Sequence, residues 1–252
     1  ITFGRDYPIS EILLNKPITI TGEQSTGIYF NHDIDLLGGQ ARNKDTSNNI
    51  VTDISTSSTS TKESILNVDI TAGKGNSGLF FDASGKTFDI ANSTINLAGG
   101  SENSGIFAQQ GTVNLNNASK INVNLTGGKN NIGIYSNSGS GTTAVNTKAN
   151  VNITGGTQGI GILSVKGKIT NEGKVSVGSA NNVGAVASSA DGDFENTTGT
   201  ISVNTTDAVG IAGMNNGIAR VSGGTVSATG RATAALYANK DGKVNATGGT
   251  IT

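Results

Sequence analysis

Apolar and polar residues alternate in short runs along almost the whole chain, and the same arrangement returns at a nearly fixed interval. One interval contains the runs 112–115 and 121–125, in which Val, Leu or Ile occupies every second position. In a strand every second side chain faces the same way, so each run predicts one apolar face and one face of Asn, Thr, Ser or Asp. The pattern predicts three short β-strands in each interval.

A Gly followed by two apolar residues marks each interval. This marker occurs at Gly27-Ile28-Tyr29, Gly78-Leu79-Phe80, Gly105-Ile106-Phe107, Gly133-Ile134-Tyr135, Gly161-Ile162-Leu163, Gly184-Ala185-Val186 and Gly210-Ile211-Ala212, with a degenerate copy at Ala235-Leu236-Tyr237. Successive markers are 51, 27, 28, 28, 23, 26 and 25 residues apart. Repetition at such a period is typical of a solenoid, whereas an antiparallel sandwich gives no reason for it. We therefore predict an all-β parallel β-helix (β-solenoid) with about 25–28 residues and three short strands per coil.

In a parallel solenoid, equivalent residues of successive coils stack about 4.8 Å apart. We expect the aromatic residues of the markers (Tyr29, Phe80, Phe107 and Tyr135) to form one such stack in the interior. The Gly pairs at 99–100, 127–128 and 155–156 follow apolar strands and are expected at the corners, where glycine tolerates positive φ.

The composition fits a narrow core of small side chains, because the chain has 37 Gly residues and only 4% aromatic residues. Disorder is the competing interpretation of such a composition, but a disordered chain lacks the regular apolar positions seen here. A net charge of −1 provides no basic surface for nucleic acid or anionic lipid. No run of about 20 apolar residues occurs, so this segment is not expected to be embedded in a membrane.

The marker and strand sequences resemble those of the passenger domains of type V (monomeric, classical) autotransporter adhesins. Ser104-Gly105-Ile106-Phe107, Ile132-Gly133-Ile134-Tyr135 and Thr126-Gly127-Gly128 carry the resemblance most clearly, and it extends over nearly the whole chain. The resemblance implies right-handed coiling, export through the outer membrane of a Gram-negative bacterium, and display at the cell surface by a C-terminal barrel outside this chain. It also implies a role in adhesion or aggregation.

The N-terminal segment departs from the repeat. Residues 1–20 are rich in apolar groups and contain both prolines, so they are expected to be an N-terminal cap or an irregular first coil. Residues 21–252 are expected to form the repeats, and the chain stops at Ile251-Thr252, in the middle of a coil.

A loop insertion at about 38–63 interrupts the repeats, with a small strand expected at 50–54. Its polar and charged residues Arg42, Asn43, Lys44 and Asp45 are the candidate partner-binding residues, because binding residues concentrate on excursions from rigid scaffolds. A neutral insertion or a degenerate coil is the alternative.

No catalytic, cofactor-binding or metal-binding residues are predicted, and the chain is not expected to be an enzyme. Residues 73–78 match a dinucleotide-binding glycine motif, but no helical pattern follows them. His32 is the single histidine, so a catalytic triad or a histidine metal site would depend on it alone. The chain lacks cysteine, which excludes thiolate metal sites. A polysaccharide-acting enzyme remains the alternative, and Asp69 and Asp89 are its candidate carboxylates.

The function predicted from the sequence is attachment to a protein or glycan on host cells or other bacteria, with no cofactor. The protein is expected to be a monomer whose many weak contacts add through effective concentration. A passive stalk spacer for a distal binding domain is the other alternative.

Overall fold

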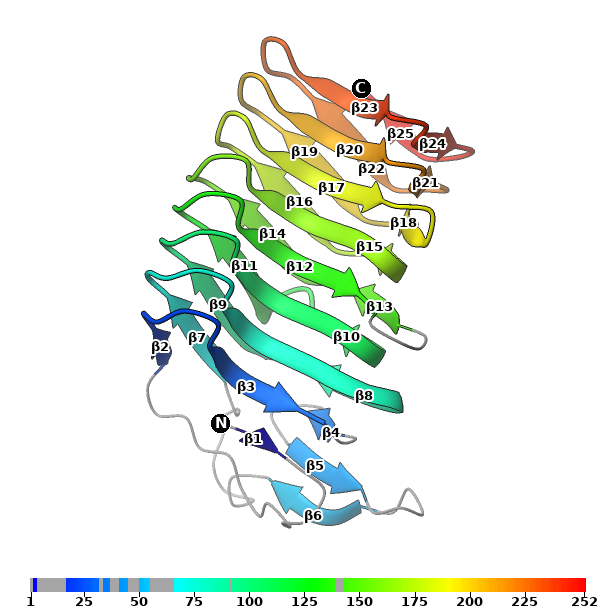
Figure 1. Cartoon of the computed structure of the whole chain (residues 1–252). Helices are drawn as coiled ribbons and strands as arrows, with labels where there is room; N and C mark the ends of the chain where they lie inside the picture. The colour runs from blue at the N-terminus through cyan, green and yellow to red at the C-terminus, as the bar shows by residue number, and fades with distance from the viewer. Residues whose placement is uncertain are drawn as a thin grey trace.

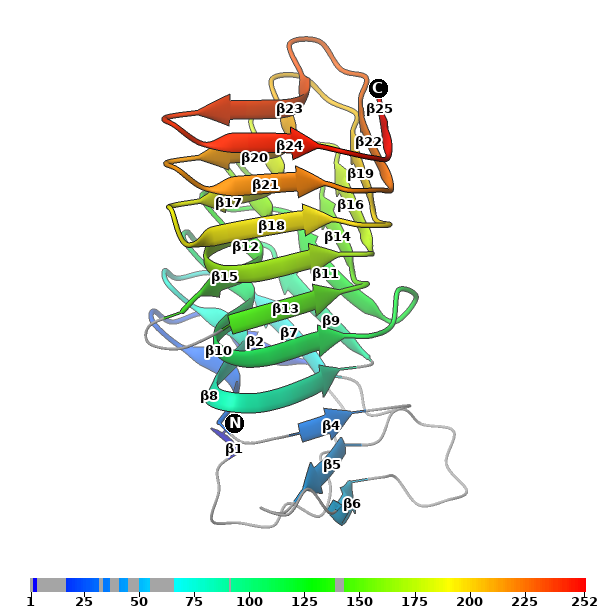
Figure 2. The same cartoon turned by 90° about the vertical axis from the view of Figure 1, so that its right-hand side faces the viewer.

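The structure is a computed structural model that describes residues 2–3, 17–31, 34–36, 41–44, 50–54, 66–90, 92–138 and 143–252. Within these ranges every regular element is a β-strand, and the strands stack as a β-solenoid of about seven turns. Strands run left to right both on the front of Figure 1 and on the side that Figure 2 turns to the viewer, while the chain climbs toward its C-terminus. The coil therefore winds right-handed, and the predicted fold class is confirmed.

Three stacks of parallel strands form the sides of the solenoid. The first face consists of β3 (Thr26–Phe30), the first parts of β8 (Ser77–Ile90), β10 (Ser104–Leu115) and β15 (Ile160–Asn171), and of β12 (Ile132–Asn137), β17 (Val183–Ser188), β20 (Val209–Met214) and β23 (Ala234–Asn239). The second face consists of β4 (Ile34–Leu36), the last parts of β8, β10 and β15, and of β13 (Thr143–Thr147), β18 (Gly192–Asn196), β21 (Ile218–Val221) and β24 (Lys243–Ala246).

The third face is a separate nine-stranded sheet. Its strands are β2 (Ile18–Ile20), β7 (Leu66–Ile70), β9 (Ser93–Leu97), β11 (Ile121–Leu125), β14 (Asn150–Ile153), β16 (Lys174–Val177), β19 (Thr200–Val203), β22 (Thr225–Ala228) and β25 (Thr250–Ile251). Each complete coil therefore contributes one stretch of strand to each face, as predicted.

The strand register reproduces the marker spacing of the sequence. Ile106 pairs in register with Leu79 and with Ile134, its counterparts in the neighbouring coils. Ile28 pairs in register with Leu79, so the 51-residue step between the first two markers is a single coil. The extra residues therefore lie between β4 and β7 and leave the stacking of the first and third faces uninterrupted.

The N-terminal edge of the solenoid is covered by further strands (Figure 1). On the first face, β1 (Thr2–Phe3) pairs with β3 in parallel. On the second face, β5 (Ala41–Lys44) pairs antiparallel with β4 and with β6 (Ile50–Ile54), the strand expected within the insertion. An open strand edge exposes unpaired backbone groups, and these pairings satisfy such groups on β3 and β4.

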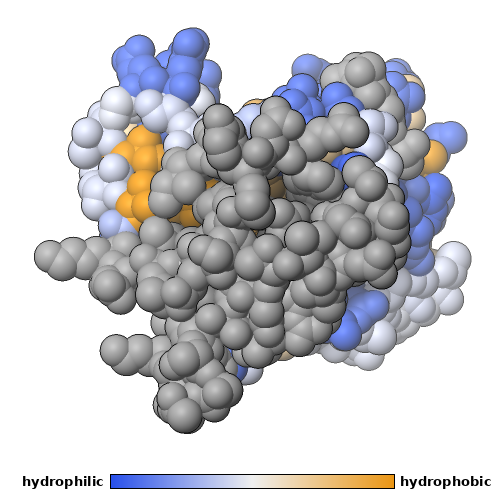
Figure 3. All heavy atoms as spheres, turned by 90° about the horizontal axis from the view of Figure 1, so that it is seen from below, coloured by the Kyte–Doolittle hydropathy of each residue, from blue (hydrophilic) through white to orange (hydrophobic). Residues whose placement is uncertain are grey.

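The interior is built from in-register columns of aliphatic side chains. On the third face one column contains Val68, Ile95, Val123, Val151, Val175, Ile201 and Val226, all fully buried. In the view from below, a patch of hydrophobic surface is visible at the left, bordered on its outer side by neutral and hydrophilic residues (Figure 3). The core thus continues from one coil to the next, as in other repeat proteins.

The marker glycines are required because their backbone lies close both to the neighbouring coil of the same face and to the third face. A Cβ on Gly105 would lie 2.8 Å from the Gly133 carbonyl oxygen and 2.9 Å from Val123 Cγ1 on the third face. At the corners glycine is required by the backbone conformation, since Gly100 and Gly128 have φ values of +69° and +81°, which other residues rarely adopt. Two different constraints therefore explain the abundance of glycine.

Buried asparagines hold the corner that precedes the first face. Asn103 Oδ1 accepts a hydrogen bond of 2.8 Å from the Asn76 backbone N–H, and Asn131 Oδ1 accepts one of 3.0 Å from the Asn103 backbone N–H. The Asn103 side-chain amide donates to the Gly99 and Gly73 carbonyl oxygens, which belong to its own coil and to the coil below. These side chains satisfy backbone groups that the strand ladder leaves over at the bend.

Candidate contact surface

Four aromatic side chains stack on the outer side of the first face. This column, named here the aromatic ridge, consists of Tyr29, Phe80, Phe107 and Tyr135. Successive ring centroids are 5.2, 4.9 and 4.8 Å apart, with interplanar angles of 28°, 20° and 19°. All four side chains are partly exposed. The strand register brings them together, because their positions pair directly across β3, β8, β10 and β12.

The predicted stacking of these residues is confirmed, but their predicted place in the interior is wrong. Ile28 and Phe30 are fully buried, whereas Tyr29 between them is partly exposed. Successive side chains of a strand point to opposite sides, so both apolar residues of a marker cannot face the core. The interior positions that follow the ridge residues are occupied by Phe30, Phe81, Ala108 and Ser136. Ser164 and Ala187 occupy the equivalent interior positions of the next two coils.

The ridge ends where its column becomes aliphatic. Leu163 follows Tyr135 in register, and Val186 and Ala212 follow in the next coils. Tyr237 occupies the same column on β23 and is 43% exposed, but Val186 and Ala212 separate it from the ridge. The aromatic ridge is therefore confined to the coils from β3 to β12.

Polar groups flank both end members of the ridge. The Tyr29 hydroxyl donates to Asp82 Oδ2 at 3.2 Å, and the Tyr135 hydroxyl accepts from Asn137 Nδ2 at 2.8 Å. Burial, followed by the Asp82 charge, raises the pKa of Tyr29 above its ordinary value of 10.0. Burial also raises the pKa of Tyr135, against the opposing effect of the Asn137 hydrogen bond. Both phenols are therefore protonated hydrogen-bonding groups at neutral pH.

The geometry of the ridge decides which partners it can contact. Phe80 and Phe107 each stack on a neighbour at both ring faces, so they present ring edges to solvent. A sugar ring packs on an exposed aromatic face, and the inner members of the ridge offer none. Ring edges beside tyrosine hydroxyls instead form a narrow apolar strip with polar ends, which suits the packed centre of a protein interface.

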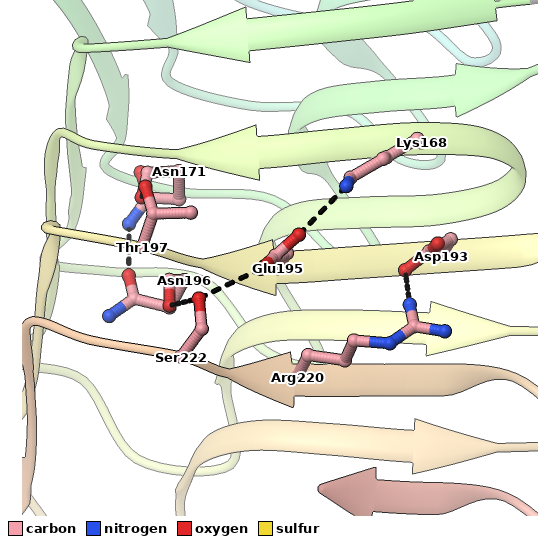
Figure 4. A network of polar contacts seen from close by, with 8 residues as sticks. All are labelled: Lys168, Asn171, Asp193, Glu195, Asn196, Thr197, Arg220 and Ser222. Atoms are coloured by element: carbon pink, nitrogen blue, oxygen red, sulfur yellow. Dashed lines mark hydrogen bonds and ion pairs between the residues drawn. The ribbon is translucent and has the colours of Figure 1, made fainter. Parts of the chain in front are cut away.

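A second group of polar side chains ties neighbouring coils together on the second face (Figure 4). Lys168 Nζ lies 2.7 Å from Glu195 Oε2, and the Ser222 hydroxyl donates to Glu195 Oε1 at 2.8 Å. Arg220 pairs with Asp193 on the neighbouring strand. Hydrogen bonds from Lys168 and then from Ser222 hold the pKa of Glu195 below its ordinary value. A carboxylate fixed in its charged form ties the coils of β15, β18 and β21 together and is poorly suited to proton transfer.

Three of the four candidate residues of the insertion, Arg42, Asn43 and Lys44, lie on β5. Arg42 pairs in register with Asp35 of β4 and with Asp53 of β6. Asp45 lies outside the described residues. The structure thus places Arg42, Asn43 and Lys44 in the antiparallel extension of the second face, away from the column of the aromatic ridge.

The two carboxylates considered for an enzyme belong to different columns. Asp69 on the third face accepts from the Asn96 amide at 2.7 Å, and Asp89 on the second face accepts from the Asn114 amide at 2.7 Å. Each begins a column of asparagine amides, so the structure does not pair them as an acid and a base.

The glycine motif and the single histidine are the other features considered from the sequence. Residues 73–78 lead into strand β8 and not into a helix, while His32 lies outside the described residues. Among the residues that the structure describes, no group of three or more His, Cys, Asp or Glu side chains is placed to hold a metal ion. No helix in these ranges is long and apolar enough to cross a membrane.

Comparisons of the chain with protein-family models, with curated proteins and with solved structures give no match. The assignment of the aromatic ridge as the candidate contact surface therefore depends on the geometry of the chain itself.

Proposed function

We propose that the chain is part of the passenger domain of a monomeric autotransporter adhesin. In this proposal the protein is exported through the outer membrane of a Gram-negative bacterium and displayed at the cell surface. There it attaches to a protein on host cells or other bacteria through the aromatic ridge. The right-handed parallel solenoid supports the proposal, because the resemblance of the repeats to such passengers implies this architecture.

The observation that carries the proposal is the partial exposure of four stacked aromatic rings. On the third face the outward positions hold mostly small polar residues, as in the column Asn96, Asn124 and Asn152. The fold does not require aromatic residues in the ridge column, because Leu163 and Ala212 occupy it in later coils. Aromatic side chains concentrated at one exposed strip are typical of a protein-binding surface.

The mechanism is contact along a rigid rod. Every coil is tied to the next by parallel pairing, so the ridge is preformed and loses little conformational entropy on binding. Many copies on one cell would add weak contacts through effective concentration. Arg42, Asn43 and Lys44 are a second candidate contact, on the antiparallel extension.

A competition assay tests the proposal. The purified 252-residue chain is added to cells that display the full-length protein, and their attachment to target cells is counted. We expect the chain to inhibit attachment in a dose-dependent manner. No inhibition at saturating concentration would instead support a passive spacer, with the binding site in another part of the protein.

A further inference from the structure

A polar hollow opens at the corner between the second and third faces. Its volume is about 340 Å³, and its lining residues are Asn114, Asn116, Asn146, Thr147, Lys148 and Glu172. Asn114 lies on β10, Asn146 lies on β13, and Glu172 directly follows β15, so the hollow extends over three consecutive coils. It lies on a different face from the aromatic ridge.

A local departure from the repeat builds this hollow. Leu115 and Asn122 are seven positions apart, whereas their register equivalents Thr147 and Asn150 are three positions apart. The additional residues form a turn that projects beyond the corner after β10 (Figure 2). The turn forms a ledge next to the hollow.

The ledge is held in place by its own hydrogen bonds. Asn117 Oδ1 accepts from the Ser119 backbone N–H at 3.0 Å and from the Ser119 hydroxyl at 2.9 Å. The Asn150 amide of the next coil donates to the Ala118 carbonyl oxygen at 2.5 Å. The shape of the hollow is therefore preorganised, which reduces the entropic cost of binding a ligand.

The amide groups of the hollow are also fixed in orientation. The side-chain amides of Asn114 and Asn116 donate to Asp89 Oδ1 at 2.7 and 3.2 Å, and the Asn146 amide donates to Asn114 Oδ1 at 2.8 Å. Among the described residues no donor is bonded to the side-chain oxygens of Asn116 and Asn146. These two oxygens are therefore ready to accept hydrogen bonds from a ligand.

Charged groups complete the lining. Lys148 Nζ lies 3.6 Å from Glu172 Oε2, and these side chains are 49% and 43% exposed. The hollow thus combines ammonium donors with carboxylate and amide acceptors. An anion is disfavoured because Glu172 stands in the hollow and Lys148 is already paired with it. An apolar ligand is disfavoured because no large apolar side chain belongs to the lining.

We propose that this corner hollow binds one neutral sugar residue of a glycan. Each sugar hydroxyl both donates and accepts a hydrogen bond, and neighbouring hydroxyls match the alternating donors and acceptors of the lining. The volume is at the lower end of the range for ligand pockets, as a single pyranose ring requires. This site goes beyond adhesion through the aromatic ridge and does not depend on it.

Saturation-transfer NMR on the purified chain tests the proposal, with the methyl glycosides of glucose, galactose, mannose and N-acetylglucosamine as probes. We expect saturation of at least one glycoside, with a Kd on the order of 1 mM, as is ordinary for a small polar ligand. The double variant Asn116→Ala, Asn146→Ala should weaken that binding about tenfold or more. The control Asn152→Ala, on the outer column of the third face, should leave it unchanged.

A mapping measurement on the wild-type chain keeps the proposal testable if the double variant folds poorly. Backbone amide signals of residues 116–120, 146–148 and 172 should shift during titration with the bound glycoside. Absence of saturation for all four probes would overturn the proposal, and so would shifts confined to residues outside the hollow. Neither experiment involves a ridge residue, so failure of the hollow and failure of the adhesion proposal are distinguishable.

Discussion

The N-terminal and C-terminal coils of the solenoid share an interior but differ in what they display. Inside the first face, Ile106, Ile134, Ile162 and Ile211 are all fully buried at the same register. On the outer side of the same face, the column is aromatic and partly exposed up to β12. Beyond it Leu163 of β15 is partly exposed, whereas Val186 of β17 and Ala212 of β20 are only 2% and 1% exposed. The interior positions are constrained by the fold, whereas the partly exposed outer positions from Tyr29 to Leu163 change from aromatic to aliphatic and so determine the chemistry of contact.

The second face shows the same contrast. Its N-terminal coils display the amide column Asp89, Asn114 and Asn146, which leads into the corner hollow. Its C-terminal coils display the ion pairs Lys168–Glu195 and Asp193–Arg220. Substitutions inside the shared core should therefore cost most in stability, and substitutions of the displayed groups should cost least.

The largest loss of stability is expected when a marker glycine is replaced by a residue with a side chain. In Gly105→Val, Cβ alone would lie 2.8 Å from the Gly133 carbonyl oxygen, and overpacking of a tight core costs up to about 3 kcal/mol. Urea unfolding measures the change in the free energy of unfolding. The control Gly178→Ala meets only the Ile153 carbonyl oxygen at 3.6 Å, an ordinary contact, and should be nearly neutral. Equal losses in both variants would contradict this account of the core.

A smaller loss of stability is expected when the hydrogen bonds of a corner asparagine are removed. Asn103→Ala leaves the buried Asn76 backbone N–H without its acceptor, which costs about 1–3 kcal/mol. The control Asn124→Ala removes an amide from the outer column of the third face and should cost about 0.5 kcal/mol, because water replaces its bonds. Thermal unfolding followed by circular dichroism ranks the two variants, and the reverse order would contradict a structural role for Asn103.

Shortening the aromatic ridge should cost less again. Phe107→Leu removes two ring pairs, at 4.9 and 4.8 Å, and each pair contributes about 0.5–1.5 kcal/mol beyond buried area. Since leucine retains much of the packing of the ring it replaces, we expect the free energy of unfolding to fall by about 1 kcal/mol. The reverse change, Leu163→Phe, extends the column by one coil and should stabilise or leave stability unchanged. Destabilisation by Leu163→Phe in urea unfolding would show that the outer position is not free.

The smallest effect belongs to the ion pairs, and it depends on pH. The folded-state pKa of Glu195 is lowered, so its contribution is fully present above the unfolded value near 4.5 and is lost as pH falls through the lower folded value. Glu195→Gln should lower the free energy of unfolding by less than about 1 kcal/mol at pH 7. The difference from wild type should vanish toward pH 2. Urea unfolding across this range checks it, and a pH-independent difference would exclude the proposed cause.

Much of the fold could be predicted because the period of the coils is visible as a repeat of short local sequences. The marker spacing gives the register directly, as the pairing of Ile106 with Ile134 shows. The same alternation should also have placed Phe107 outside, because Ile106 and Ala108 beside it are buried. The two apolar residues of each marker therefore do not form one interior unit, since they point to opposite sides of the strand.

Other features required three-dimensional information. The repeated Asn two residues before the marker Gly, at positions 76, 103, 131 and 182, was a visible signal, but its burial depends on the shape of the corner. The antiparallel pairing of β5 with β4 depends on an edge that local sequence does not reveal. The corner hollow depends on residues from three coils that are up to 58 positions apart.

The most direct test of the contact surface compares two soluble competitors of cell attachment. One is the wild-type chain and the other carries Phe80→Leu, Phe107→Leu and Tyr135→Leu, changes that the fold accepts at Leu163. With circular dichroism showing equal β-content in both, the account predicts that the triple variant inhibits attachment at least about tenfold more weakly. Equal inhibition by the two chains would contradict the role of the aromatic ridge.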